Sequence, residues 1–573
     1  MINVSLGLLA LMVSGPFLLP FHTEPIPSFW NEWWAGTLGL AAVVAGLFAA
    51  RGRLRLSPLL IIPTLLLATL LLQSAFGRLA FPQLGLLYAV YLLWAGLLMV
   101  LGRYLADTLG LARLADVLAC AFALGALAGA AAALAQWTGF STAVPWIFPR
   151  LSVAVYANLG QVNHHTHYSW LGITSLFYLR GRGWLSRPML WLVTLLIALG
   201  SVVSGSRSVF VYPLILLGVV AWTRFREPHG TTAALFVDAA FLLPMVIALS
   251  YLSSWISSYL PSPAAISGSR LYELVSGPSV RLALARTTWS AFLEHPWLGQ
   301  GVGNYSWASF VAAAGRAGNE PFQVAENAHN FILQGLAEFG LPATGAVILL
   351  LLFWARRFAG RPWGLEQFWG GAVLGIGAAH ALLEYPLWYA YFLGPTAFLL
   401  GATDSGSTVS VPGRRVVVYL ALVVLAGISI LTGLRMDYSV IEAASNQPLA
   451  ADQDPERAWQ ISMERLKLMH RESLLSPWAL LAFVELAEPS RQQAQDRVTL
   501  CERGIRFQPA RSLVVRCAMQ QAIVGRAQDA RALILAVLRA FPAERTATAN
   551  ELAKGAKEFS VIEPLRVLAE SFR

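Results

Sequence analysis

The sequence predicts an all-α membrane protein that crosses the bilayer many times and carries a helical domain outside the membrane. Hydrophobic residues make up 57% of the 573 residues, charged residues only 13%, and the mean hydropathy is +0.59. Such values are typical of polytopic membrane proteins. After residue 435 the composition changes to charged, Ala/Leu/Arg-rich sequence. We therefore expect a transmembrane domain over residues 1–435 and an extramembrane helical domain over residues 436–573.

Apolar segments close to the length that crosses a bilayer recur along the first domain. A transmembrane helix needs about 20 apolar residues, and about thirteen segments approach this length. The predicted spans are residues 4–20, 35–50, 57–74, 83–101, 114–135, 164–180, 188–204, 208–223, 231–252, 341–355, 367–383, 386–402 and 416–434.

Arginines in the loops between these spans predict the orientation. They fall on alternate loops, at residues 51–55, 103–113, 180–187, 224–226, 356–361 and 413–415. Positively charged loops stay in the cytoplasm, so these loops share the cytoplasmic face. The opposite face then carries residues 21–34, 136–163, 253–340, 381–388 and everything after Arg435. Because the net charge of +10 comes from dispersed arginines, nucleic acid is not an expected partner.

The last domain has the pattern of helical hairpins. The stretch "GIRFQPARSLVVRCAMQQAIVGRAQDARALILAVLRAFP" alternates helix-length segments with proline breaks and a Gly-Arg turn. Tetratricopeptide-like repeats and a small helical bundle both fit this pattern. "DQD" at residues 452–454 reads as the N-terminal cap of a helix that starts at Pro455 rather than as a metal site. Cys501 and Cys517 could pair in an oxidising compartment, but their spacing does not require it.

Polar clusters interrupt the apolar sequence on the outer face. They are "HTEPIPSFWNEWW" (22–34), "NLGQVNHHTHYSW" (158–170), "SGSRS" (204–208), the loop 253–340 with Arg270, and "HALLEYPLWYAYF" (380–392). Ionisable groups in or beside spans are costly to bury, so each cluster is a functional candidate. Polar groups within spans also occur along the permeation paths of transporters. Their location at one face disfavours a midplane transport site.

The loop 253–340 ends in "ENAHNFILQGLAEFGL". Glu326, Asn330, Gln334 and Glu338 recur every four residues and form one polar stripe on an expected helix, with His329 beside Glu326. The stripe either lines a wet cavity or is solvated surface. The glycines at 299, 301 and 303 follow no predicted strand, so we expect a tight turn that lets backbone N–H groups approach a ligand or another helix.

These residue types indicate a chemistry. Arginine binds phosphate and diphosphate groups through forked hydrogen bonds, and histidine titrates near neutral pH, so it can activate a hydroxyl group. The aspartates before residue 437 are at 107, 116, 238 and 404, all near the expected cytoplasmic face. Zinc at His164, His165 and His167 is disfavoured because no carboxylate is fixed nearby. We therefore expect no metal and no cofactor.

Six sequence stretches resemble motifs of one superfamily. "AHNFILQGLAEFGL", "HPWLGQGVGNYSW" and "SGSRS" resemble the histidine stretch, glycine turn and arginine motif of the O-antigen ligase superfamily. "GQVNHHTHYSWLG" and "HALLEYPLWYAYFLGP" are similar to segments of bacterial protein O-oligosaccharyltransferases, the pilin glycosylation ligases, and "FHTEPIPSFWNEW" also fits. Val162 stands where that family has proline. The motifs cover roughly residues 20 to 400 and leave out the last domain.

The resemblance implies a glycosyltransferase-C-like membrane enzyme of the bacterial inner membrane. It would transfer a preassembled glycan from undecaprenyl diphosphate to serine or threonine of an exported protein such as pilin, in the periplasm. An O-antigen ligase or polymerase with a sugar hydroxyl acceptor remains the alternative. The implied catalytic base is His329, and Glu326 is expected to orient its ring. The implied ligands of the donor diphosphate are Arg207, Arg281 and Arg286. The implied acceptor or glycan pocket contains Gln161, Asn163, His164, His380, Glu384, Tyr385 and Tyr389.

Overall fold

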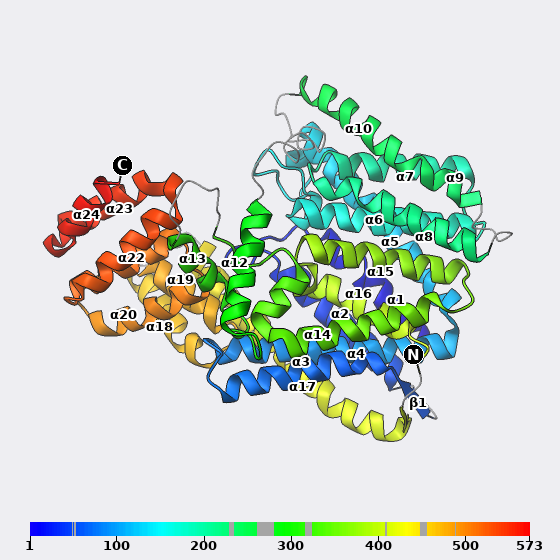
Figure 1. Cartoon of the computed structure of the whole chain (residues 1–573), viewed down its shortest axis with the longest axis horizontal. Helices are drawn as coiled ribbons and strands as arrows, with labels where there is room; N and C mark the ends of the chain where they lie inside the picture. The colour runs from blue at the N-terminus through cyan, green and yellow to red at the C-terminus, as the bar shows by residue number, and fades with distance from the viewer. Residues whose placement is uncertain are drawn as a thin grey trace. The chain divides into compact units, whose positions relative to one another are not determined.

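The computed structural model describes the chain except residues 49, 51–52, 228–233, 261–279, 316–323, 407–408, 447–454, 488 and 573 (Figure 1). Arg270 and the "DQD" stretch therefore lie outside the described residues. The chain forms two compact units. The first comprises Met1–Thr64, Tyr91–Gly277 and Val347–Leu431, and the second comprises Leu65–Val90, Pro278–Ala346 and Thr432–Arg573.

Nearly all regular structure in the described chain is helical. The first unit contains α1 (Ile2–Met12), α2 (Phe29–Leu47), α5 (Leu111–Thr138), α6 (Val162–Gly181), α7 (Arg187–Val202), η5 (Arg207–Phe210), α8 (Tyr212–Arg226), α9 (Leu235–Ala240), α10 (Leu242–Ser257), α15 (Leu365–Leu383) and α16 (Ala390–Thr403). Four helices run from one unit into the other: α3 (Ile61–Ala75), α4 (Pro82–Leu109), α14 (Phe331–Ala359) and α17 (Gly413–Asn446). The second unit adds α12 (Val280–Glu294), α13 (Tyr305–Ala314), α18 (Pro455–Glu472), α19 (Ser476–Leu486), α20 (Ala494–Phe507), α21 (Arg511–Ile523), α22 (Ala527–Ala540), α23 (Arg545–Glu558) and α24 (Glu563–Glu570).

The prediction of an all-α polytopic membrane protein is confirmed. Every predicted span falls on helical structure. Within the described residues, 7 helices are long and apolar enough to cross a membrane. The other predicted spans are shorter or more polar, so the number thirteen stays a prediction.

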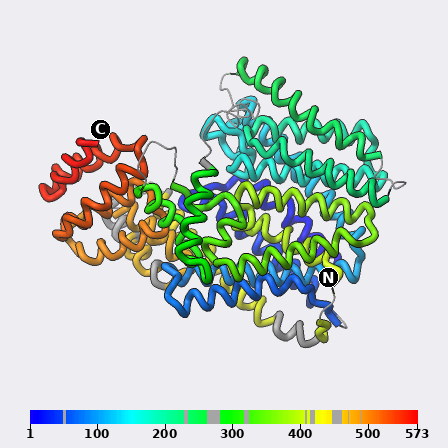
Figure 2. Tube along the Cα trace, in the orientation of Figure 1, coloured from blue at the N-terminus to red at the C-terminus, as the bar shows by residue number. Residues whose placement is uncertain are grey.

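Helix α6 explains why a polar segment can occupy a membrane domain. It carries His164, His165 and His167, yet every residue from His164 to Leu179 is buried. The helices α5, α7 and α15 pack around it, as the traces of α5 to α7 show (Figure 2). Buried polar groups need hydrogen-bond partners, and α6 has some inside the protein: the Thr166 hydroxyl lies 3.0 Å from that of Ser204, and Ser175 Oγ accepts from Trp369 Nε1 at 3.1 Å.

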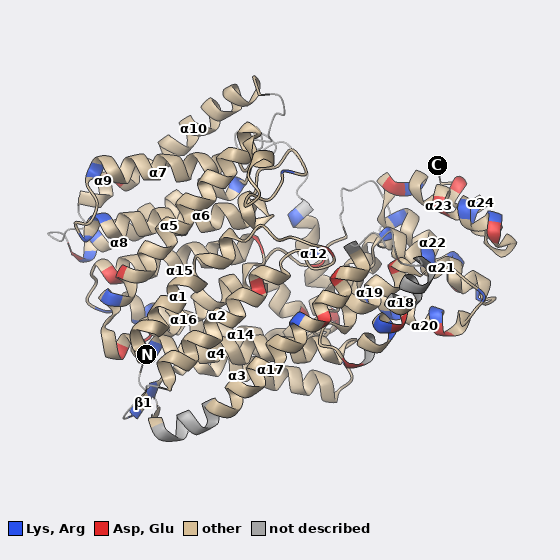
Figure 3. Cartoon of the chain, turned by 180° about the vertical axis from the view of Figure 1, so that it is seen from behind, with Lys and Arg blue, Asp and Glu red and all other residues tan. Residues whose placement is uncertain are grey.

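The arginine-rich loops of the first unit lie together. Strand β1 (Arg53–Leu56) pairs antiparallel with β2 (Val409–Pro412). Charged residues gather at one end of the helices, at the ends of α8 and α9 (Figure 3). Each aspartate there has an arginine partner: Asp107 with Arg55, Asp116 with Arg182, Asp238 with Arg187, and Asp404 with Arg357. The predicted sharing of one face therefore agrees with the structure, and which compartment that face meets stays a prediction.

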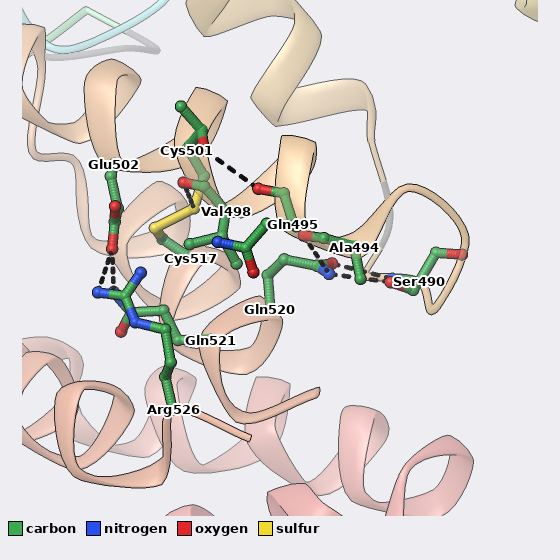
Figure 4. The surroundings of a disulfide bond; sticks show 11 residues. Ser490, Ala494, Gln495, Val498, Cys501, Glu502, Cys517, Gln520, Gln521 and Arg526 are labelled. Atoms are coloured by element: carbon green, nitrogen blue, oxygen red, sulfur yellow. Dashed lines mark hydrogen bonds and ion pairs between the residues drawn. A yellow bond between two sulfur atoms is a disulfide. The ribbon is translucent and has the colours of Figure 1, made fainter. Parts of the chain in front are cut away.

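The last domain consists of helical hairpins. Successive helices pack as pairs, among them α18 with α19, α20 with α21, and α23 with α24. Cys501 of α20 and Cys517 of α21 form a disulfide with a Cα–Cα distance of 5.4 Å (Figure 4). Helix α18 covers Pro455–Glu472, and the predicted cap at residues 452–454 lies outside the described residues. Helix α13 from the loop 253–340 packs on α22, where Phe310 lies 6.2 Å from Phe541. This part of the loop and the last domain thus belong to one compact unit.

Candidate functional site

In the first unit, the segments predicted to face outward are joined by a chain of hydrogen bonds. Asn163, in the first turn of α6, donates from Nδ2 to Glu384 Oε1 at 2.8 Å. The Ser206 hydroxyl donates to Asn163 Oδ1 at 2.6 Å, and Ser206 immediately precedes Arg207. Glu384 and Ser206 are only 3% and 2% exposed. Asn163 therefore ties the arginine motif to the carboxylate that follows α15.

The first turn of α6 is capped by Gln161. Its Oε1 accepts from the His164 backbone N–H at 2.6 Å, which satisfies one of the free donors at a helix start. This cap fixes the direction in which His164 leaves the helix. The ring of His164 then packs 4.8 Å from Tyr389 and 5.8 Å from His380, measured between ring centroids.

His380 lies inside the protein. It is fully buried, its Nδ1 is 2.7 Å from the Tyr212 hydroxyl, and its ring is 4.4 Å from that of His167. Tyr385 and Tyr389 are half-buried, with ring centroids 5.9 Å apart. The structure thus brings all the predicted pocket residues together. His164 and His380 form its interior, whereas the two tyrosines are partly exposed.

Glu32 holds the tyrosine segment in place. Its carboxylate accepts from the Ser28 hydroxyl at 2.6 Å, from the Tyr91 hydroxyl, and from the Ala390 backbone N–H at 3.5 Å. Ala390 directly follows Tyr389. The sequence indicated Glu32 as part of an outer polar cluster, but it contains no signal for these partners, because Tyr91 and Ala390 are distant in the chain.

In the second unit, the predicted helix over residues 326–330 is wrong. Helix α14 begins at Phe331, and the residues from Glu326 to Asn330 are irregular. Asn330 caps the helix, since its Oδ1 accepts from the N–H groups of Ile332 and Leu333, both at 3.0 Å. The four-residue spacing of polar side chains therefore does not make a stripe from Glu326 onward, and Glu326 is not one helical turn before His329.

His329 has an unusual backbone. It is half-buried and adopts φ 50°, in the left-handed region that non-glycine residues rarely occupy. This conformation costs a non-glycine residue about 1–2 kcal/mol. Such strain persists where the surroundings impose it, often at functional sites. Here the next residue caps α14, and the N–H of the preceding residue, Ala328, donates to Gln334 Oε1 at 2.7 Å.

Helix α14 is interrupted at Gly340, after His329, and packs there against the turn that contains glycines 299, 301 and 303. Gly340 has φ 79° and ψ 174° inside the helix, and a Cβ there would lie 2.5 Å from the Trp297 carbonyl oxygen. Gly299, with φ 72°, crosses so closely that its Cβ would lie 2.2 Å from the Glu338 carbonyl oxygen. Only glycine permits these contacts. The turn therefore approaches a helix, one of the two expected partners.

Glu338 anchors this crossing. It is 2% exposed, and its Oε1 accepts from the Gly303 N–H at 3.0 Å. Gln73 donates to the backbone oxygens of Leu298 and Glu338 at 2.8 and 2.6 Å. Gln73 is not among the predicted site residues, although a single glutamine in the apolar span 57–74 indicates a buried polar contact. The stripe residues Gln334 and Glu338 are thus interior supports rather than solvated surface.

The remaining predicted residues lie on the exterior of the second unit. Glu326 is exposed, and its Oε1 accepts from Gln508 Nε2 at 2.7 Å. Gln508 follows α20, so this bond joins the histidine segment to the last domain. Arg281 and Arg286 are both exposed on α12.

In the same unit, burial raises the pKa of Tyr305 to about 12. The hydroxyl of Tyr305 lies 2.8 Å from that of Thr288, so the phenol is a neutral structural group.

Metal ligands are not clustered in the part of the chain that the structure describes. It contains no group of three or more His, Cys, Asp or Glu side chains that could hold an ion. His165 lies apart from the other two histidines of this segment, with its Nε2 3.2 Å from the Gly200 carbonyl oxygen, whereas the rings of His164 and His167 both pack against His380 and Phe392.

Comparison with known proteins finds two matching family models and a relative. The family model described as O-antigen ligase matches residues 192–348, which include Arg207 and His329. The family model described as virulence factor membrane-bound polymerase, C-terminal, matches residues 368–554. The chain is 26% identical over 452 residues to a general O-oligosaccharyltransferase of Acinetobacter baylyi, covering 77% of this chain and 78% of the relative.

Proposed function

We propose that the chain is a protein O-oligosaccharyltransferase of the O-antigen ligase superfamily. It transfers a preassembled glycan from undecaprenyl diphosphate to a serine or threonine hydroxyl of an exported protein such as pilin. The observation that carries this proposal is the match to a general O-oligosaccharyltransferase along 77% of the chain. The match includes most of both proteins rather than one shared domain.

The proposed chemistry needs one activated hydroxyl and one stabilised leaving group. The hydroxyl oxygen forms a bond to the anomeric carbon while the bond from that carbon to the diphosphate oxygen breaks. His329 accepts the hydroxyl proton. Its strained backbone at the cap of α14 supports this role, because the strain shows that surrounding contacts fix the residue. Glu326 remains a candidate to assist it, although its helical placement no longer supports that role.

Arginine replaces a metal in this proposal. The leaving diphosphate carries negative charge, and Arg207, Arg281 and Arg286 bind it by charge-assisted hydrogen bonds. Arg207 has the strongest support, because the Ser206–Asn163–Glu384 chain fixes the segment that carries it. Gln161, Asn163, His164, His380, Glu384, Tyr385 and Tyr389 form the wall that positions glycan or acceptor. The half-buried tyrosines offer the contact surface, and the buried residues hold them.

We place the enzyme in the bacterial inner membrane with its active site in the periplasm. The arginine-rich loops support this orientation by the positive-inside rule. The Cys501–Cys517 disulfide supports an oxidising compartment for the last domain, because disulfides persist in the periplasm and are rare in the cytosol.

The test is co-expression with a lipid-linked glycan pathway and a candidate pilin, followed by intact mass measurement of the pilin. The expected result is a mass increase equal to the whole glycan, which disappears when the enzyme is omitted. An unmodified pilin in cells that hold both enzyme and donor would contradict the proposal for that acceptor.

A second function, ligation or polymerisation of O-antigen, is favoured by the two matched family descriptions. It uses the same donor with a sugar hydroxyl as acceptor. The same cells separate the two functions: glycan on lipopolysaccharide, or longer glycan on the lipid carrier, with no modified protein would indicate the second.

A further inference from the structure

A pocket in the second unit lies between the loop before α4 and one face of α20. Its volume is ≈ 220 Å³, and it is lined by Ala80, Phe81, Thr499, Glu502, Arg503 and Arg506. The last four residues are spaced three, one and three apart, so they share one face of α20. We call this site the α20 pocket.

The α20 pocket is positively charged. Glu502 is compensated, because Arg526 Nη2 lies 2.9 Å from its Oε1 (Figure 4). Among the residues that the structure describes, no carboxylate pairs with Arg503 or Arg506. Arg506 is exposed, and the guanidinium of Arg503 lies over the Phe81 ring, 5.6 Å from its centroid. The pocket therefore offers two cations to a ligand.

Aromatic residues make the bottom of the α20 pocket rigid. Phe81 is 3% exposed and lies 5.6 Å from Phe507, which in turn lies 5.1 Å from Trp478. Edge-to-face contacts of this kind hold the rings in a fixed arrangement. A ligand thus meets an apolar, preformed base beside positive charge.

The same helix end reaches the histidine segment. Gln508, two residues after Arg506, donates to Glu326, three residues before His329. The helix that lines the α20 pocket therefore also contacts the segment that carries His329, to which we assign hydroxyl activation. A substrate carrying that hydroxyl is the occupant that makes use of this proximity.

We propose that the α20 pocket binds the acceptor polypeptide, through an acidic side chain and a neighbouring apolar side chain close to the modified serine or threonine. This proposal rests on the proposed function. Sites for whole small molecules are usually about 300–1,000 Å³, so this pocket suits one or two side chains. A sugar would need several oriented hydrogen bonds, whereas the lining offers the Thr499 hydroxyl, two arginines and an already paired carboxylate.

Binding is tested without turnover. Full-length enzyme in detergent is titrated into a fluorescent peptide rich in serine and alanine that carries two aspartates and a leucine, or into the same peptide with both Asp→Asn. We expect the aspartate peptide to bind at least about tenfold more tightly, and Arg506→Glu to remove that preference. Arg531→Glu is the control, because Arg531 is exposed on α22 outside the pocket and the charge change is the same.

Turnover gives the second measurement. The substrate is an unmodified acceptor protein that the wild-type enzyme glycosylates and whose aspartates flank the target serine. With it, Arg506→Glu should raise the acceptor KM about tenfold and leave kcat and the donor KM near wild type. An acceptor with Asp→Lys should restore the KM of that variant. Equal peptide binding by wild type and Arg506→Glu, or equal KM effects of Arg506→Glu and Arg531→Glu, would refute acceptor binding here. Failure of the proposed function is distinct, since the wild-type enzyme itself would then modify no protein.

Discussion

His329 shows how a single residue can be constrained by its neighbours. The backbone at φ 50° sits between a hydrogen bond from Ala328 N–H and the capping side chain of Asn330. A residue that only filled space would not need a conformation that costs about 1–2 kcal/mol. A glycine substitution can therefore separate the role of the imidazole ring from that of the backbone, because glycine adopts this φ without strain but has no ring.

We predict that His329→Ala and His329→Gly both lower the rate of transfer by about 10²–10⁴-fold, the usual contribution of a general base. His329→Gly should also unfold at a higher temperature than His329→Ala, because glycine adopts positive φ without strain. Glycosylated pilin per unit of folded enzyme and thermal unfolding in detergent measure the two effects. Near wild-type specific activity in either variant would end the assignment of His329 as the base.

The Arg207 assignment predicts that charge alone is insufficient. Arg207→Lys keeps the charge but loses the planar fork that binds two phosphate oxygens, so transfer should fall at least about tenfold. Arg539→Lys, on the exposed surface of α22, is the matched control and should act as wild type. The donor KM and kcat report the change, and equal activity of both variants would contradict diphosphate binding by Arg207.

If arginines neutralise the diphosphate, divalent ions are dispensable. We therefore predict that transfer continues at an unchanged rate after treatment of the purified enzyme with a chelator. Loss of activity that a divalent ion restores would point to a metal mechanism, with His164, His165 and His167 as the first residues to substitute.

The helices are well predicted from the sequence, and their ends are poorly predicted. Every apolar segment became helical because length and hydrophobicity are local properties. The predicted start of α14 is wrong because the spacing pattern treats Asn330 as a helical position, whereas its short amide side chain caps the helix. The break at Gly340, two residues before Pro342, had a visible signal, but its partner Gly299 comes from contacts distant in sequence.

The glycine crossing makes a prediction about stability. Gly340→Ala should lower the free energy of unfolding by about 1–2 kcal/mol or more, because alanine at positive φ is strained and its Cβ would overlap the Trp297 carbonyl. Gly345→Ala, in the same helix, meets no atom closer than 4.0 Å and should be neutral or stabilising. Thermal unfolding of both variants in detergent provides the comparison; equal stability would show that the crossing is dispensable.

The partition of the chain into two compact units is not predictable from composition. The change in composition near residue 435 lies close to Thr432, where the last segment of the second compact unit begins. The second unit also takes Leu65–Val90 and Pro278–Ala346 from the membrane part of the sequence, however. These pieces join through contacts such as Gln73 with Glu338 and Gln508 with Glu326, and each contact links segments that no local pattern relates.

The orientation of the molecule gives the last prediction. Arginine-rich loops lie together at one end of the first unit, so we predict that they face one compartment, and by the positive-inside rule we predict that it is the cytoplasm. The exposed residues Trp184, in one of these loops, and Arg531, in the last domain, should then lie on opposite sides. In a variant without other reactive thiols, a membrane-impermeant maleimide should label Arg531→Cys in cells with a permeabilised outer membrane, and Trp184→Cys only after lysis. The reverse pattern would place the last domain, and with it the proposed acceptor pocket, in the cytoplasm, where an exported acceptor never meets the enzyme.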